Sequence, residues 1–334
     1  MSAAAAGGLR QGLAVALAAL AVGTFHVPQP FLCVLAAQLT AGVAASGPRE
    51  LGWRLLAAAA GSAGSMCVLV LAPNEQWVSL PLFFVHAGFG TVWFLRRHGV
   101  ACGIFFAMGA ASMFAEAFVF PERDLGFGFA HLASLVLAML AVFPVSFYFL
   151  GWKRPGGTGE WDGSDAGQIG ATAVLAVLFA CVFLQSQLTV TTVAAVVTAL
   201  AMLGNTGGIG GRFAGGIAGI LVSLAFLIVF SGSGNDVGVY LVGLAVLAGC
   251  FEWGAVRFPR AAAGLRQGAA MFVVGSTIFP RPELYLVHSM ERAAAIFLGL
   301  AAGCAVALAR AEAARIFAGA VLGRSIFRRS SGQD

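Results

Sequence analysis

Charged residues are scarce in this chain of 334 residues: only 10% are Asp, Glu, Lys or Arg, whereas 60% are hydrophobic. Soluble domains carry about 25% charged residues, so this sequence lacks the polar surface that a globule in water needs. The mean hydropathy of +0.91 points the same way. These values exclude a soluble enzyme, a disordered chain and a nucleic-acid binder. They predict an all-α polytopic membrane protein.

Motifs of catalysis and metal binding are also missing. The six cysteines never form Cys-x-x-Cys and the five histidines show no His-Glu-x-x-His spacing, which argues against a zinc site and a disulfide framework. The glycine-rich run 204–211 is not followed by Gly-Lys-Ser/Thr, so we reject nucleotide binding. No Ser/His/Asp or Cys/His arrangement follows from the spacing. We expect no enzyme activity, no cofactor and no metal.

The chain has long apolar runs instead. A helix that crosses the hydrocarbon core needs about 20 mostly apolar residues. Breaks at charges, prolines and glycine clusters predict twelve transmembrane helices. Their expected ranges are 11–26, 31–46, 53–72, 77–95, 99–119, 128–150, 167–185, 188–204, 212–230, 236–254, 264–279 and 286–308.

The basic residues predict the orientation of these spans. If the N-terminus is cytoplasmic, 16 of the 19 Lys and Arg residues fall in inside segments, and only Arg123, Arg281 and Arg292 remain outside. This split follows the positive-inside rule. We expect both termini in the cytoplasm and a bacterial inner (plasma) membrane. The apolar run after Arg10 is interpreted as the first span rather than a secretory signal, because no clear small-x-small cleavage site precedes His26.

The two halves of the chain resemble each other. A shift of 158 residues superimposes Arg54 on Arg212 and Gly61 on Gly219. Because each half has six expected spans, both enter from the same side, which predicts two parallel repeats as in secondary transporters. The expected division is a first repeat at 1–150, a short cytoplasmic linker at 151–166, a second repeat at 167–308 and a basic cytoplasmic tail at 309–334. The tail is interpreted either as an interfacial helix or as a frayed basic end.

Small residues recur at every fourth position after the two repeated arginines. They lie on one helix face, where a neighbouring backbone can approach closely. This predicts a helix-packing face, and the alternative is a sliding surface or a wall of a translocation path. The residues are Ala57, Gly61 and Ser65 in the first half, and Gly207, Gly211, Gly215, Gly219 and Ser223 in the second.

Two six-span units, each with Arg-x6-Gly opening its third helix, resemble the fusaric acid resistance family, which includes aromatic acid exporters. The resemblance implies an inner-membrane efflux protein for aromatic or amphipathic acids. In Gram-negative bacteria it also implies a periplasmic membrane-fusion (adaptor) partner. Many relatives carry a large cytosolic domain, whereas the joint at 151–166 is only about fifteen residues long. A compact member of the family is therefore the better comparison.

Ionisable groups inside spans cost about 2.5–3.5 kcal/mol on insertion scales and are therefore functional candidates. Glu116 would load and release a proton, and the alternative is a carboxyl that reaches water at the outer interface. Arg292 follows Glu291 at the start of the twelfth expected span and offers a bidentate fork. We expect it to bind a substrate carboxylate or Glu116; the alternative is an interfacial arginine that snorkels outward or pairs with Glu291.

Three further polar residues are candidates for the substrate or proton pathway. His86 lies mid-span between Pro81 and two glycines, which are expected to distort the fourth helix. It would serve as a proton relay or substrate hydrogen-bonding group, or else as a packed histidine. Gln38 and Gln187 would line a central path or form hydrogen bonds between helices.

These observations favour a proton-coupled secondary transporter that exports aromatic or hydrophobic carboxylic acids by alternating access, an antiporter. The alternatives are a non-transporting scaffold subunit of an envelope or efflux assembly and an intramembrane lipid-modifying enzyme. The lack of a clustered acid–base or metal set disfavours the enzyme. The expected partners are the lipid bilayer, a small organic acid, an adaptor protein and a second copy of the chain.

Overall fold

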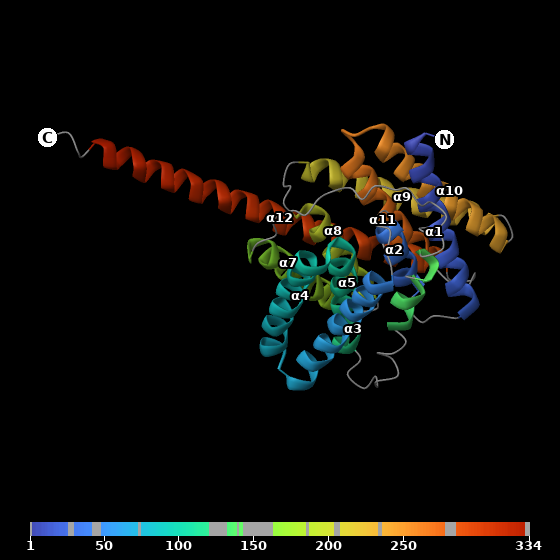
Figure 1. The fold of residues 1–334 in the computed structure, drawn as a ribbon, viewed down its shortest axis with the longest axis horizontal. Helices are drawn as coiled ribbons and strands as arrows, with labels where there is room; N and C mark the ends of the chain where they lie inside the picture. The colour runs from blue at the N-terminus through green and yellow to red at the C-terminus, as the bar shows by residue number, and fades with distance from the viewer. Residues whose placement is uncertain are drawn as a thin grey trace.

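The computed structural model describes residues 2–25, 30–41, 48–72, 75–119, 132–138, 140–142, 163–184, 187–203, 208–232, 236–277 and 285–330. Every regular element in these ranges is helical (Figure 1). The elements are α1 Ala3–Phe25, α2 Pro30–Ala41, α3 Pro48–Leu71, α4 Gln76–His98, α5 Val100–Val119, a short helix Leu132–Val142, α7 Gly163–Phe183, α8 Leu188–Met202, α9 Ile209–Gly232, α10 Val237–Arg257, α11 Ala262–Ser276 and α12 Tyr285–Ser330.

Eight helices in the described ranges are long and apolar enough to cross a membrane. The chain is therefore a multi-pass membrane protein by the length and composition of its helices. The other expected spans coincide with shorter helices of 10–17 residues, which are α2, α8, Leu132–Val142 and α11. The helices that qualify as spans are α1, α3, α4, α5, α7, α9, α10 and α12.

Four helices form the core of the molecule: α2, α5, α8 and α11. Residues 101–116 of α5, 188–199 of α8 and 267–277 at the end of α11 are buried without interruption. Figure 1 shows these helices in the middle of the body. Three of them, α2, α8 and α11, are short, and polar side chains on each, such as Gln38, Thr192 and Gln267, are buried in protein.

The outer helices have one buried face and one apolar exposed face. On α10, for example, Leu244 and Ala248 are buried whereas Val242 and Val246 are more than half exposed. Trp77 at the start of α4 is 88% exposed. Apolar patches of this extent are avoided on soluble monomers, whereas lipid covers them at no cost.

Glycines allow the helices to pack at backbone contact. A Cβ atom at Gly61 of α3 would overlap the carbonyl oxygen of Phe106 on α5. A Cβ atom at Gly219 of α9 would likewise overlap the carbonyl oxygen of Gly268 on α11. The small-residue faces of α3 and α9 therefore lie against α5 and α11.

Two other glycine contacts join helices that are far apart in the sequence. Gly8 of α1 and Gly249 of α10 face each other, and a Cβ atom on either would lie 2.8 Å from the carbonyl oxygen of the other. On the other side of the molecule, Gly88 of α4 lies against the carbonyl of Ala166 on α7. The first helix of each half thus packs against the fourth helix of the other half (Figure 1).

The last helix, α12, runs for 46 residues from Tyr285 to Ser330. At 1.5 Å per residue it is about 69 Å long, more than twice the thickness of a hydrocarbon core. Figure 1 shows that it projects well beyond the body, with the C-terminus near its far end. The helix passes through Arg310 without a break, so the described part of the tail continues the twelfth helix rather than forming a separate element.

Candidate functional site

Glu116 lies near the end of α5 and is 93% shielded, with a relative exposure of 7%. Its Oε2 atom accepts a hydrogen bond of 2.6 Å from the hydroxyl of Thr189, in the first turn of α8. The structure therefore places this carboxyl inside the protein, against a helix of the other half, rather than in water at the interface. A hydroxyl–carboxyl contact of this length lies at the short end of the O–H···O range in proteins.

Arg292 lies near the start of α12, and its guanidinium group contacts both α11 and α2. Its Nη1 atom donates to the carbonyl oxygen of Thr277, just after the end of α11. Its guanidinium carbon lies 5.4 Å from the centroid of the Phe31 ring, at the start of α2. A cation over an aromatic face is stabilised by the ring quadrupole. The arginine is half-buried.

The two ion pairs expected of Arg292 are not formed. Glu291 instead faces His288, with 3.4 Å between Oε2 and Nδ1, and both side chains are exposed. Glu116 is bonded to Thr189. Local pairing fails because Glu291 and Arg292 are adjacent on the helix, where neighbours point in different directions.

Glu116 and Arg292 lie at corresponding helix junctions of the two halves, although they are on helices that do not correspond, α5 and α12. Glu116 lies where the end of α5 meets the start of α8, and Arg292 lies where the end of α11 meets the start of α2. Thr189 and Phe31 are separated by 158 residues, which is the shift of the internal repeat. The repeat shift can be read from the sequence, but the partners of Glu116 and Arg292 can be identified only in the fold.

His86 fills a notch in α3 formed at Gly64, where a Cβ atom would overlap the imidazole ring. Its Nε2 atom lies 2.9 Å from the carbonyl oxygen of Gly61, and the ring centroid lies 5.1 Å from that of Phe106. Helix α4 continues through Pro81 from Gln76 to His98, so the expected distortion does not interrupt the helix. The structure brings His86 to α3 and α5, and does not bring it to Glu116 or Arg292.

Glutamine side chains form hydrogen bonds between helices near the C-terminal ends of α2 and α8, away from Phe31 and Thr189. The Gln11 amide donates to the carbonyl of Gln38 at 2.9 Å, and the Gln168 amide donates to the carbonyl of Ala199 at 3.4 Å. Gln267 donates to the hydroxyl of Thr198 at 2.9 Å. The side-chain oxygens of Gln38 and Gln267 are buried without a hydrogen-bond partner. Gln187 is half-buried and precedes α8, and its carbonyl accepts a bond from Thr191.

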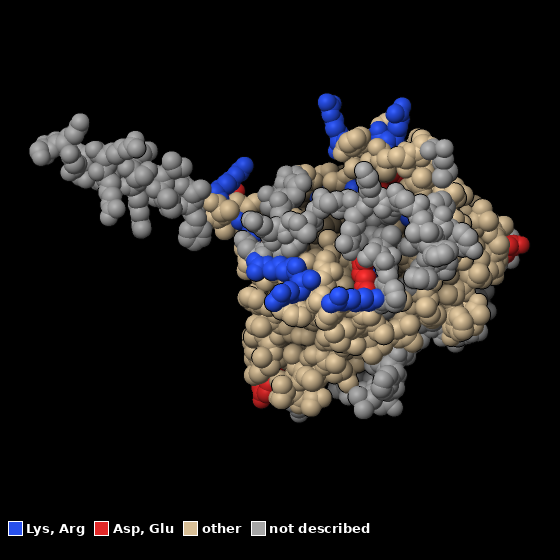
Figure 2. Space-filling model, in the orientation of Figure 1, with Lys and Arg blue, Asp and Glu red and all other residues tan. Residues whose placement is uncertain are grey.

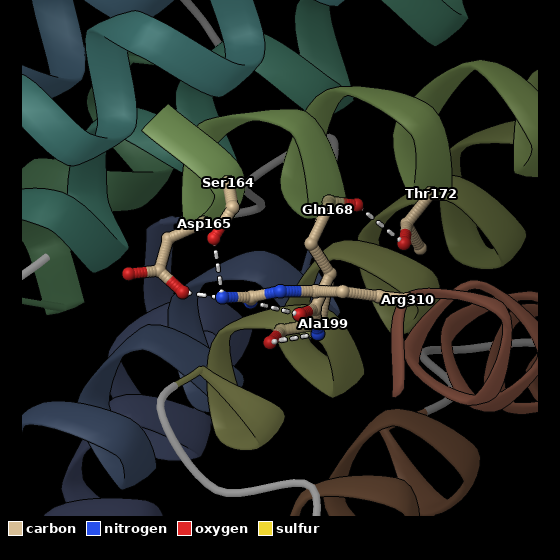
Figure 3. A network of polar contacts seen from close by, with 6 residues as sticks. All are labelled: Ser164, Asp165, Gln168, Thr172, Ala199 and Arg310. Carbon is tan, nitrogen blue, oxygen red and sulfur yellow. Dashed lines mark hydrogen bonds and ion pairs between the residues drawn. The ribbon is translucent and has the colours of Figure 1, made fainter. Parts of the chain in front are cut away.

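Arg310 holds α12 against α7 through a network that sequence reasoning missed (Figure 3). Its Nη1 atom lies 2.7 Å from Asp165 Oδ1 and 2.6 Å from Gln168 Oε1, and its Nη2 atom lies 2.6 Å from the Ser164 hydroxyl. Asp165 is buried, with an exposure of 3%. The sequence assigns Arg310 to the basic tail, because the twelfth span is expected to end at residue 308.

Arginines near the beginnings of α3, α11 and α1 have acidic partners. Arg54, which is 1% exposed, pairs with Glu50 one turn earlier at 3.0 Å. Arg266 contacts Glu252 of α10 through two bonds of 3.1 and 3.2 Å. Arg10 lies beside the same glutamate. Most of the described surface visible in Figure 2 is uncharged, and its arginine side chains lie at the upper edge, near the origin of the projecting helix and across the middle of the face.

The described residues contain no group of three or more His, Cys, Asp or Glu side chains that would hold a metal ion. The chain matches no family model, no curated protein and no solved structure. The candidate functional site is therefore defined by geometry alone, as the end of the core that carries Glu116 and Arg292.

Proposed function

We propose that the protein is a membrane transporter of twelve spans, built from two parallel six-helix repeats. The interlocking of the halves supports this layout. In one contact, Gly8 and Gly12 of α1 pack against Gly249 and Ala245 of α10. The corresponding contact of the other half uses Ala166 and Gly170 of α7 with Gly88 and Phe84 of α4. Shifts of 158 for α1 and 161 for α4 relate the two sets residue by residue.

A hydrogen bond in each half supports the same layout. Gln11 donates to the carbonyl of Gln38, and Gln168 donates to the carbonyl of Ala199. The donors are 157 residues apart and the acceptors 161, so the two bonds join corresponding pairs of helices but not equivalent residues. The residue-by-residue agreement in packing, together with bonds between the same helix pairs, favours a duplicated unit over a chance likeness of apolar helices.

The proposed activity is proton-coupled export of aromatic or hydrophobic carboxylic acids by alternating access. The observation that carries it is the burial of Glu116 at the junction of the two halves, bonded to Thr189. A carboxyl in this position changes its net charge when it takes up a proton, which alters the cost of keeping it between α5 and α8. Movement of the halves that separates Thr189 from Glu116 would then depend on the proton.

Arg292 would bind the carboxylate of the cargo in the corresponding place of the other half. Its guanidinium group remains charged in a poor dielectric and presents a planar fork to two oxygens. Phe31, which already lies under the guanidinium group, would pack against the aromatic part of the cargo. This arrangement gives a reason for an acid in one half and a base in the other.

The proposed location is a bacterial inner membrane with both termini in the cytoplasm. The proposed partner is a periplasmic adaptor protein of the kind that serves aromatic acid exporters. A second candidate is a non-transporting scaffold subunit, which the projection of α12 beyond the body favours (Figure 1). A free helix of this length offers a surface to other proteins of an envelope assembly.

Transport in proteoliposomes tests the proposal. The purified chain is reconstituted with radiolabelled benzoate, and an inward or outward proton gradient is imposed. The proposal predicts benzoate movement that the gradient accelerates and that Glu116→Gln uncouples from the proton. If neither the acid nor the gradient has an effect, while the protein retains its helical content and oligomeric state, the transporter is excluded and the scaffold is favoured.

A further inference from the structure

Arg212, in the first turn of α9, is the repeat counterpart of Arg54 but lacks its acidic partner. Arg54 pairs with Glu50 four residues earlier, whereas the position four residues before Arg212 is Gly208. In the part of the chain that the structure describes, no hydrogen bond or ion pair to the side chain of Arg212 is present. Its Nε atom is buried nonetheless.

The surroundings of Arg212 make this charge costly. The side chain lies beside Cys304 of α12, and the cluster that contains Cys304 is apolar, with Ile209, Leu300 and Ala307 among its buried members. Arg266 of α11 interacts electrostatically with Arg212 and has the same sign. Arg266 shares its own glutamate, Glu252, with Arg10. Glu252 therefore already has two arginines beside it, and Arg212 has Arg266 as a neighbour of like charge.

We propose that Arg212, assisted by Arg266, is the cationic part of a site for an oxyanion, either the phosphate of an anionic lipid headgroup or the carboxylate of a soluble acid. A guanidinium group satisfies both kinds of ligand with paired hydrogen bonds. The ligand would take the place that Glu50 fills beside Arg54. The site is not a nucleotide site, because no Gly-Lys-Ser/Thr follows the glycines before α9.

The beginning of α9 leaves room for such a ligand. Among the described residues, added Cβ atoms at Gly208, Gly210 and Gly211 would meet no atom within 4 Å, and all three glycines are exposed. Arg212 itself is half-buried, so its guanidinium group remains reachable. Basic pockets between helix ends on the cytoplasmic side of membrane proteins bind anionic headgroups in this way.

Ligand binding to the full-length protein tests the site without any transport measurement. The wild type, Arg212→Gln, Arg212→Lys and Arg260→Gln are placed in nanodiscs of phosphatidylcholine, with and without phosphatidylglycerol, and their melting temperatures are measured. Benzoate is titrated separately into the phosphatidylcholine discs. Arg260 is exposed in the turn before α11, so Arg260→Gln removes the same charge as a matched control.

We expect the wild type and Arg260→Gln to be stabilised by one of the two anions. Arg212→Gln should bind it about tenfold more weakly, the loss expected for one charge-assisted contact. Arg212→Lys keeps the charge but not the planar guanidinium group, so its affinity should lie between those of the wild type and Arg212→Gln. It also serves as a second variant in case Arg212→Gln does not fold. A response to phosphatidylglycerol alone that Arg212→Gln weakens identifies a headgroup, and a response to benzoate that Arg212→Gln weakens identifies a carboxylate; a benzoate response unaffected by Arg212→Gln belongs to the Arg292 site. The inference is overturned if the wild type responds to neither, or if all variants respond alike.

This experiment measures binding and uses no proton gradient, so its outcome does not depend on whether the protein transports benzoate. A wild type that transports benzoate but shows no Arg212-dependent binding contradicts only this site.

Discussion

Thr189 donates a hydrogen bond of 2.6 Å to Glu116, and this contact joins α8 to α5 across the two halves of the chain. The acceptor is one of the few carboxyl groups among the described residues that are enclosed by the core. The same place in the other half is occupied by Phe31, on whose ring Arg292 lies. The two halves therefore share their packing but differ in charge where they meet.

Loss of the hydroxyl group at residue 189 should remove the hydrogen bond to Glu116 while the carboxyl group itself remains. Thr189→Val keeps the shape of the side chain and leaves the carboxyl without this donor, so we expect a loss of about 1–3 kcal/mol in stability. Thermal unfolding in detergent measures this loss. The control is Thr24→Val, because the Thr24 hydroxyl bonds only to its own helix at an exposed site. Equal effects of the two substitutions would contradict a special role for the Thr189–Glu116 bond.

Substitution of Arg292 should separate charge from geometry. Arg292→Lys retains a positive charge but loses the planar guanidinium group, and Arg292→Ala loses both the charge and the group. We expect benzoate transport to fall about tenfold in the lysine variant and further in the alanine variant. Initial rates in proteoliposomes give the comparison. Unchanged transport by a folded Arg292→Ala protein would remove Arg292 from the site.

Bulk on the small-residue face should disrupt the contact between α9 and α11. Gly219 faces the carbonyl of Gly268, so Gly219→Val should destabilise the protein by about 1–3 kcal/mol or more. Gly52→Ala in α3 is the control, because its added methyl group meets nothing within 4 Å. The melting temperatures of the two variants decide the matter. A Gly219→Val protein as stable as the control would show that this close approach is not needed.

The contact between Arg310 and Asp165 should stabilise the docking of α12 on α7. Removing one partner of a largely buried pair costs about 3–5 kcal/mol, so Asp165→Asn and Arg310→Gln should each lower the melting temperature strongly. The double variant should lose less than the sum of the two, because the residues are coupled. Arg315→Gln, whose pair with Glu312 is exposed, should have no measurable effect. Additive losses would argue against the network in Figure 3.

The sequence predicts a membrane protein and the positions of most helices, because long apolar runs indicate the helices and basic residues indicate the turns between them. The face that contains Gly61 and Gly219 could also be recognised, since small residues at four-residue spacing are a local signal. The partner of each face could not, because contacts such as Gly8 with Gly249 join segments about 240 residues apart.

Charged residues were harder to interpret than glycines. Glu116 could be proposed because it interrupts an apolar run, but whether it faced water or Thr189 depended on the packing of α5 against α8. Arg310 was assigned to a tail because the sequence carries no signal for where α12 ends. The sequence predicts a distorted helix around His86. In the fold, α4 is continuous through Pro81 and the imidazole fills a notch at Gly64, a contact that no local pattern indicates.

The central claim is that Glu116 carries the proton that drives export of an organic acid. Proton movement and labelled benzoate movement should be recorded together in the same proteoliposomes, for the wild type and for Glu116→Gln. The account predicts that the two fluxes keep a fixed ratio in the wild type. It predicts that Glu116→Gln abolishes the proton flux, while exchange of benzoate across the membrane in the absence of a gradient persists. A Glu116→Gln protein that moves protons and benzoate in the wild-type ratio would contradict it.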